Sequence, residues 1–106
     1  MKIVKIPFNE WSMERLASGQ KTCTTRSKRY GNPGDSFYAG KSLHKIKEVL
    51  QFPLWFVRDY LWYPEGAKSS EEFVKIWCEI HPREGVKENK IGYTHFFTNP
   101  NGHPKQ

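Results

Sequence analysis

The chain has 106 residues, of which 37% are hydrophobic and 26% charged, a balance typical of one soluble globular domain. No apolar run approaches the roughly 18 to 20 residues of a membrane-spanning helix, and the N-terminal residues lack the apolar core of a secretory signal. The formal net charge is +6; residues 1–60 hold 11 basic against 5 acidic residues, and residues 61–106 hold 6 against 6. This basic half suits a phosphate-bearing partner such as RNA, or is simply a solvated surface.

The first half of the chain predicts three strands and one helix. Alternating residues 2–6 predict a short strand, and a helix is expected to begin after Asn9, its N-cap, and to end at Gly19. The β-branched residues 22–26 predict a second strand. A basic loop over residues 28–34 then leads to a strand over residues 35–38.

The second half predicts two strands and two helices. Residues 43–52 read as a longer strand and residues 54–62 as a short helix, broken by Pro64-Glu65-Gly66. Helical spacing over residues 69–80 predicts a helix with a core-facing stripe formed by Phe73, Ile76, Trp77 and Ile80. Residues 91–97 predict the last strand. The pattern indicates an α+β fold, a small barrel with two or three flanking helices over residues 1–98, followed by a flexible tail over residues 99–106.

Reactive groups gather just after the first helix, in Lys21, Thr24 and Arg26. In a regular strand Thr24 and Arg26 share one face while Lys21 points to the other, so Lys21 meets Thr24 only if the chain bends after Gly19. A lysine base beside a hydroxyl nucleophile also needs its pKa lowered by about three units from roughly 10.4. The alternative is a polar edge strand with a surface lysine.

Glu72 is the carboxylate that the sequence offers as a partner for this segment. It begins the helix over residues 69–80, on the border of the apolar stripe. Its other interpretation is structural, because Ser69-Ser70-Glu71-Glu72 has the spacing of a capping box. The two roles are compatible.

Metal and disulfide chemistry find little support in the sequence. No histidine has a second ligand at metal spacing, so neither a metal nor another cofactor is expected. Cys23 and Cys78 are far apart and indicate free thiols of an intracellular protein, which predicts a cytoplasmic location. The protein is expected to be a monomer and to have no membrane partner.

The spacing Gly19-x-Lys21-x-x-Thr24-x-Arg26, followed by Gly34-Asp35, resembles the signature of the ASCH domain, a PUA-like barrel. Among ASCH proteins the chain is most similar to the small bacterial N4-acetylcytidine amidohydrolases. This resemblance implies that Thr24 is the nucleophile, Lys21 its activating base and Glu72 the third catalytic group. Arg26 and His81 would then contact the substrate, His81 standing where those enzymes carry tyrosine before a proline.

Two alternatives to the amidohydrolase stay open at this point. One is an RNA-binding module, whose affinity would depend on Lys28, Arg29 and Lys45. The other is a metal-independent ribonuclease that cleaves single-stranded RNA with Lys21 and Arg26 around the phosphate. The substrate would accordingly be a nucleoside or RNA.

Overall fold

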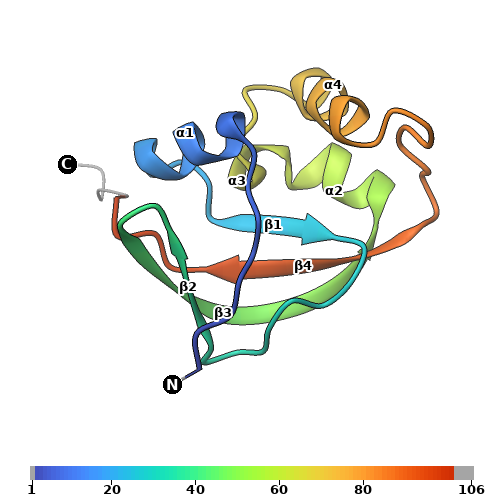
Figure 1. The fold of residues 1–106 in the computed structure, drawn as a ribbon. Helices are drawn as coiled ribbons and strands as arrows, with labels where there is room; N and C mark the ends of the chain where they lie inside the picture. The colour runs from blue at the N-terminus through green and yellow to red at the C-terminus, as the bar shows by residue number, and fades with distance from the viewer. Residues whose placement is uncertain (1, 102–106) are drawn as a thin grey trace.

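The computed structural model describes residues 2–101 of the chain. Its elements in chain order are α1 (Glu10–Ser18), β1 (Cys23–Arg26), β2 (Ser36–Ala39), β3 (Ser42–Pro53), α2 (Leu54–Tyr60), α3 (Trp62–Glu65), α4 (Ser70–Ile80) and β4 (Ile91–Phe97). The helices gather on the open side of a curled sheet (Figure 1). The α+β class expected from the sequence is confirmed.

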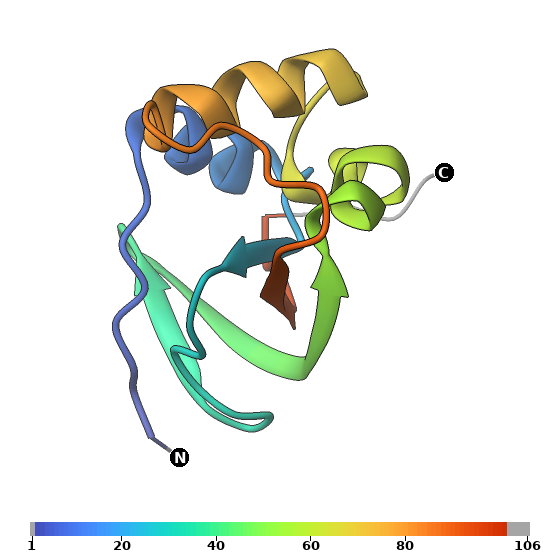
Figure 2. The same cartoon turned by 90° about the vertical axis from the view of Figure 1, so that its right-hand side faces the viewer.

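The strands form one antiparallel sheet in the order β1-β4-β3-β2. β3 is 12 residues long and pairs with both neighbours, and its register against β4 shifts between Ile46 and Glu48. A bulge of this kind adds a residue to one strand and bends it. The sheet therefore curls into an open half-barrel, which is clearest when seen from the side (Figure 2).

Two apolar clusters hold the helices on the sheet. The larger lies inside the curl and is built from Ile6, Leu16, Phe37, Ala39, Ile46, Val49 and Phe97. The smaller joins the helices to one another and contains Val57, Ala67 and Phe73. Both contribute through burial of apolar area. Between them, polar side chains of β1 are left facing the helices.

The predicted strand over residues 2–6 is not a strand in the structure. This segment makes a single bridge, Ile3 with Ser36, supported by two backbone hydrogen bonds of 2.8 Å on either side of it. Pro7 then follows, and a proline has no N–H with which to continue a ladder. The segment consequently serves as a connection from the edge of β2 to α1.

The caps predicted for the two longest helices are confirmed. The Ser12 N–H donates to Asn9 Oδ1 (2.8 Å) at the start of α1, and Gly19 ends that helix with a φ of 88°. The Ser69 hydroxyl accepts from the Glu72 N–H (3.1 Å) at the start of α4. These caps satisfy backbone donors and carbonyls that a helix end leaves free.

The chain between β3 and α4 forms two helices where the sequence predicts one helix and a break. Pro64 lies inside the short helix α3, which ends at Gly66 with a φ of 115°. Proline is tolerated there because N–H groups in the first turn of a helix have no intrahelical acceptor. The prediction that Pro64 breaks the helix is therefore wrong, and Glu65 is held in a helix.

The predicted tail begins with two asparagines that bind the body of the domain. Asn99 Nδ2 donates to the carbonyls of Leu16 (3.0 Å) and Lys21 (2.9 Å), and Asn101 Nδ2 donates to the Leu16 carbonyl (3.1 Å). The rest of the predicted tail, residues 102–106, lies outside the described residues. Within residues 2–101, no helix has the length and apolarity needed to cross a bilayer.

Candidate functional site

A cavity of about 500 Å³ lies where α1, α3 and α4 meet β1. Its wall on the helix side is apolar and its floor on the strand side is polar. The apolar wall includes Phe8, Trp11, Phe73, Ile76, Trp77 and Ile80, and the polar side chains include Lys21, Thr24, Thr25, Arg26 and Glu65. The stripe of α4 predicted to face the core does so at Phe73 and also lines this cavity, where Ile80 remains 51% exposed.

The segment between α1 and β1 is fixed to α3, and this places Lys21 beside that helix. The Gln20 side-chain amide donates to the carbonyls of Tyr63 (3.0 Å) and Ala67 (2.7 Å), and the Thr22 N–H donates to the Pro64 carbonyl (2.8 Å). Gly19 supplies the positive φ that starts this turn. The chain therefore bends before β1, and the bend directs the Lys21 ammonium to Glu65, whereas the Thr24 hydroxyl is hydrogen-bonded to Arg26.

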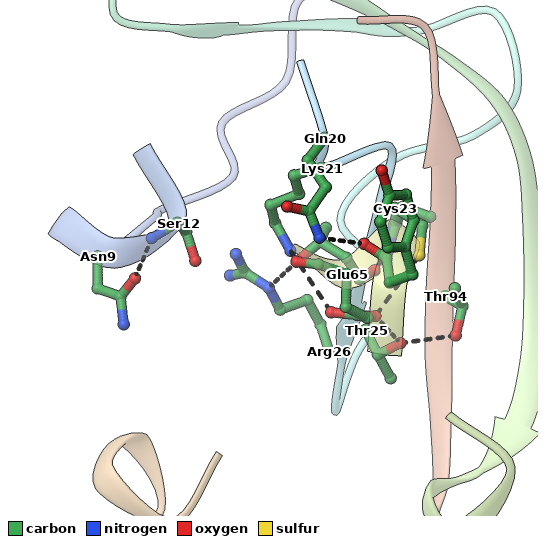
Figure 3. Close-up of polar contacts among 12 residues, drawn as sticks. Asn9, Ser12, Gln20, Lys21, Cys23, Thr25, Arg26, Glu65 and Thr94 are labelled. Carbon is green, nitrogen blue, oxygen red and sulfur yellow. Dashed lines mark hydrogen bonds and ion pairs between the residues drawn. The ribbon is translucent and has the colours of Figure 1, made fainter. Parts of the chain in front are cut away.

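Lys21 and Glu65 form a buried ion pair at the floor of the cavity (Figure 3). The Lys21 ammonium donates to the Glu65 carbonyl (2.7 Å) and to its Oε1 (3.4 Å). Lys21 is only 2% exposed and Glu65 only 5%. Over residues 2–101, Glu65 supplies both acceptors of the Lys21 ammonium. A charged pair this deeply buried loses much hydration energy, so each partner depends on the other.

Two β1 side chains bind the second oxygen of the Glu65 carboxylate. Thr25 Oγ1 lies 2.6 Å and Cys23 Sγ 3.7 Å from Glu65 Oε2, as Figure 3 shows. Because a carboxylate only accepts, Thr25 donates its proton to Glu65, and Thr94 must donate the 2.8 Å bond between the two hydroxyls. This chain of donors fixes the orientation of the carboxylate.

Cys23 is not a suitable nucleophile for this cavity. Burial, together with the nearby Glu65 carboxylate, raises the pKa of the Cys23 thiol well above its ordinary value. The reactive form of cysteine is the thiolate. The thiol is therefore a weak hydrogen-bond donor to Glu65, and hydroxyl groups are the nucleophiles that the floor offers.

Thr24 and Arg26 lie side by side on β1. Arg26 Nε donates to Thr24 Oγ1 (3.1 Å), and Arg26 Nη2 donates to the Pro7 carbonyl. The guanidinium also lies over the rings of Phe8 (5.0 Å) and Tyr30 (5.6 Å). Partial burial lowers the pKa of Arg26 from its usual value, although an arginine stays charged at neutral pH. Because the Thr24 hydroxyl accepts the hydrogen bond from Arg26 Nε, its own proton can still be donated.

His95 supports this part of β1 from the neighbouring strand. Its Nε2 accepts the Tyr30 N–H (3.0 Å), so the ring proton is on Nδ1, which contacts the Thr24 carbonyl (3.3 Å). Burial, opposed by that backbone contact and assisted by the charge of Arg26, lowers the pKa of His95. Burial likewise lowers the pKa of His44, which stacks on Phe37 in the core. The lowered pKa values favour the neutral form of both rings in the folded protein.

We expect the protein to lose stability as the pH falls from 7.5 to 5.5. The unfolded chain binds protons at His44 and His95 near pH 6.5, whereas the folded chain resists protonation until lower pH. Stability is therefore full above about pH 6.5 and falls below it, with a slope of up to about 1.4 kcal/mol per pH unit for each histidine. Urea unfolding followed by tryptophan fluorescence measures this slope. His44→Gln should reduce it, and a flat profile between these pH values would contradict the prediction.

Glu72 does not join Lys21 in the structure. Its Oε1 accepts the Lys68 N–H (2.8 Å), and its other oxygen lies 3.9 Å from the Arg15 guanidinium. The carboxylate is therefore used at the helix start, and Glu72 does not line the cavity. The carboxylate beside Lys21 is Glu65, from the preceding helix.

The remaining predicted site residues divide between the cavity and the surface. His81 lines the cavity wall and stacks on Trp77 with ring centroids 4.4 Å apart. Lys28, Arg29 and Lys45 are exposed, and the Lys28 ammonium lies 5.1 Å from the centroid of the Tyr30 ring at the cavity wall. No three His, Cys, Asp or Glu side chains within residues 2–101 are grouped to hold a metal ion.

Comparison with solved structures identifies the fold. A hypothetical protein named PH0355 aligns over 92% of this chain and 98% of its own, with a TM-score of 0.67 and 21% identity. An ASCH domain from Lactobacillus crispatus JV V101 aligns over 92% of this chain and 77% of its own, with a TM-score of 0.58 and 12% identity. The chain has the ASCH fold.

A third structure agrees with this assignment. Protein EF3133 from Enterococcus faecalis V583 aligns over 93% of this chain and 82% of its own, with a TM-score of 0.57 and 20% identity. No family model and no curated protein matches the sequence. Identities this low establish the ASCH fold alone, so the activity has to be argued from the cavity.

Glu65 is the site residue that the sequence analysis missed within the ASCH fold. The predicted helix over residues 54–62 ends before Pro64, which places Glu65 in a turn. A signal was available, because Leu54, Val57, Leu61 and Glu65 follow one another at helical intervals of three and four residues. Continuing that spacing past Pro64 puts Glu65 on the inward face, where an acidic residue needs a cationic partner.

Proposed function

We propose that the cavity is the active site of an amidohydrolase that removes the acetyl group from N4-acetylcytidine or a related acylated nucleoside. The observation that supports this most directly is the buried Lys21–Glu65 pair, which lies with the Thr24 hydroxyl at the polar floor of a cavity with aromatic walls. A flat heterocycle suits walls of this kind, because aromatic rings stack on one another. The amide that it carries would then reach the floor.

In the proposed reaction Thr24 Oγ attacks the acetyl carbonyl and forms an ester bond to the acetyl carbon. Glu65 takes a proton from the Lys21 ammonium, and the neutral amine accepts the Thr24 proton. The same proton then passes from Lys21 to the leaving exocyclic nitrogen as the C–N bond breaks. Water hydrolyses the ester to acetic acid and restores the Thr24 hydroxyl, and Glu65 returns its proton to the Lys21 amine, which regenerates the ion pair. The Arg26 N–H donor stabilises negative charge on the Thr24 oxygen.

The two adjacent threonines are expected to respond differently to the loss of their hydroxyl groups. Thr25 is bound between Glu65 and Thr94 and acts by positioning the carboxylate, so Thr25→Val should lower kcat/KM by up to about 10²-fold. Thr24→Val should cost about 10²-fold more, because the nucleophile itself is removed. Release of acetate from N4-acetylcytidine measures both.

The assay also separates the proposal from its alternative. If the native protein releases no acetate, or if Thr24→Val retains full turnover, the amidohydrolase mechanism fails. An RNA-binding module is then favoured, which the exposed Lys28 beside Tyr30 at the cavity wall supports. An RNA affinity that falls steeply with added salt would indicate such a module.

A further inference from the structure

A second cavity, of about 70 Å³, adjoins the first near the start of β4. Arg26, Ser27, Trp77 and His81 line both cavities, so the two share a wall. The smaller one is completed by residues from the loop after α4 and from β4, among them Glu84, Lys90 and Gly92. Its volume corresponds to about two water molecules, which is room for one small polar group and not for another ring.

The two cavities together hold one positive charge in excess. Their linings contain three cations, Lys21, Arg26 and Lys90, against two carboxylates, Glu65 and Glu84. Lys21 is neutralised by Glu65 (3.4 Å) and Lys90 by Glu84 (3.3 Å). Over residues 2–101, no carboxylate lies within 4.0 Å of the Arg26 guanidinium. The unbalanced charge therefore belongs to Arg26, at the junction of the two cavities.

The Arg26 guanidinium is held in place with donors to spare. It carries five N–H groups, and the protein accepts from its Nε and from Nη2. The rings of Phe8 and Tyr30 fix its plane. A fixed, partly desolvated guanidinium with free N–H groups is suited to a phosphate oxygen, which it binds without further reorganisation.

We propose that the smaller cavity is an anion subsite that binds the phosphate of a nucleotide whose base occupies the larger cavity. The placement of the base rests on the proposed function; the placement of the anion rests on Arg26 and Lys90. Arg26 would bind the phosphate from the shared wall and Lys90 from the far side. The preferred substrate is then an acylated nucleotide rather than the neutral nucleoside.

The test compares cytidine with cytidine 5′-monophosphate by titration calorimetry at constant ionic strength. We expect the phosphate to tighten binding by about tenfold or more in the native protein. Lys90→Gln should reduce this advantage about threefold while leaving the affinity for cytidine unchanged. Lys87→Gln is the matched control, because Lys87 also pairs with Glu84 (3.7 Å) but lines neither cavity.

An equal affinity for the two ligands, or an equal effect of Lys87→Gln and Lys90→Gln, would overturn the subsite. A second titration uses inorganic phosphate and follows the backbone amides of Ser27 and Gly92 by NMR. If phosphate moves these amides in the native protein and not in Lys90→Gln, the subsite stands even where cytidine does not bind. In that case the nucleoside part of the proposed function fails alone. If phosphate leaves them unmoved and the nucleotide binds no tighter than cytidine, the subsite is absent.

Discussion

Glu65→Gln should lower kcat/KM for N4-acetylcytidine by about 10³- to 10⁴-fold, at the upper end of what a positioned acid–base group contributes. Glutamine keeps an oxygen to accept the Thr25 hydroxyl proton and nearly the same volume, so the local packing is retained. It cannot take a proton from Lys21. The substitution therefore removes the proposed proton acceptor while keeping the shape of the side chain. It also removes the counter-charge of the buried Lys21 ammonium, so the stability of the variant is measured beside its activity.

Glu72→Gln is the matched control, seven residues further along the same chain. Glutamine can still accept the Lys68 N–H, and the distant contact with Arg15 contributes little at 3.9 Å. We expect kcat/KM within about twofold of the native value, because this side chain does not line the cavity. Circular dichroism and urea midpoints verify that both variants fold. Full activity in Glu65→Gln with loss in Glu72→Gln would restore Glu72 as the third catalytic group.

The contrast between Glu65 and Glu72 shows which parts of the site can be predicted from local sequence patterns. Asn9, Gly19 and Ser69 act within a few residues of themselves, so capping rules predicted these three helix ends correctly. Lys21 and Glu65 are 44 residues apart, and their meeting depends on the Gln20 amide binding the backbone around α3. No periodicity encodes a contact of that range.

The apolar stripe of α4 illustrates a second limit. Its spacing predicted correctly that these residues share one face, and Phe73 is buried as expected. Periodicity does not distinguish a face turned to a packed core from one turned to a cavity. The stripe continues past the core along the wall of the cavity to His81.

Lys21→Met should destabilise the fold by about 3 to 5 kcal/mol, because it leaves the Glu65 carboxylate buried without its cation. Such a loss is a large part of the roughly 5 to 15 kcal/mol by which small domains are stable. Glu65→Met should lower the stability by a similar amount, because it leaves the Lys21 ammonium buried without its carboxylate. The double variant should lose far less than the sum of the two, since a pair of apolar side chains of similar volume carries no desolvation penalty.

Urea unfolding of the four proteins measures the coupling between Lys21 and Glu65. We expect it to exceed the roughly 0.5 to 3 kcal/mol found for contacting residues, because the two single losses are large and the double variant loses far less than their sum. The chain holds its own control in the exposed pair of Lys90 with Glu84, whose N–O distance of 3.3 Å nearly equals the 3.4 Å of the buried pair. The same cycle there should give about 0 to 1 kcal/mol, because water screens exposed charges. Equal coupling in the two pairs would mean that burial does not strengthen the Lys21–Glu65 contact. A large difference would show that the fold depends on the same pair that the proposed reaction uses, so that loss of either partner weakens stability and catalysis together.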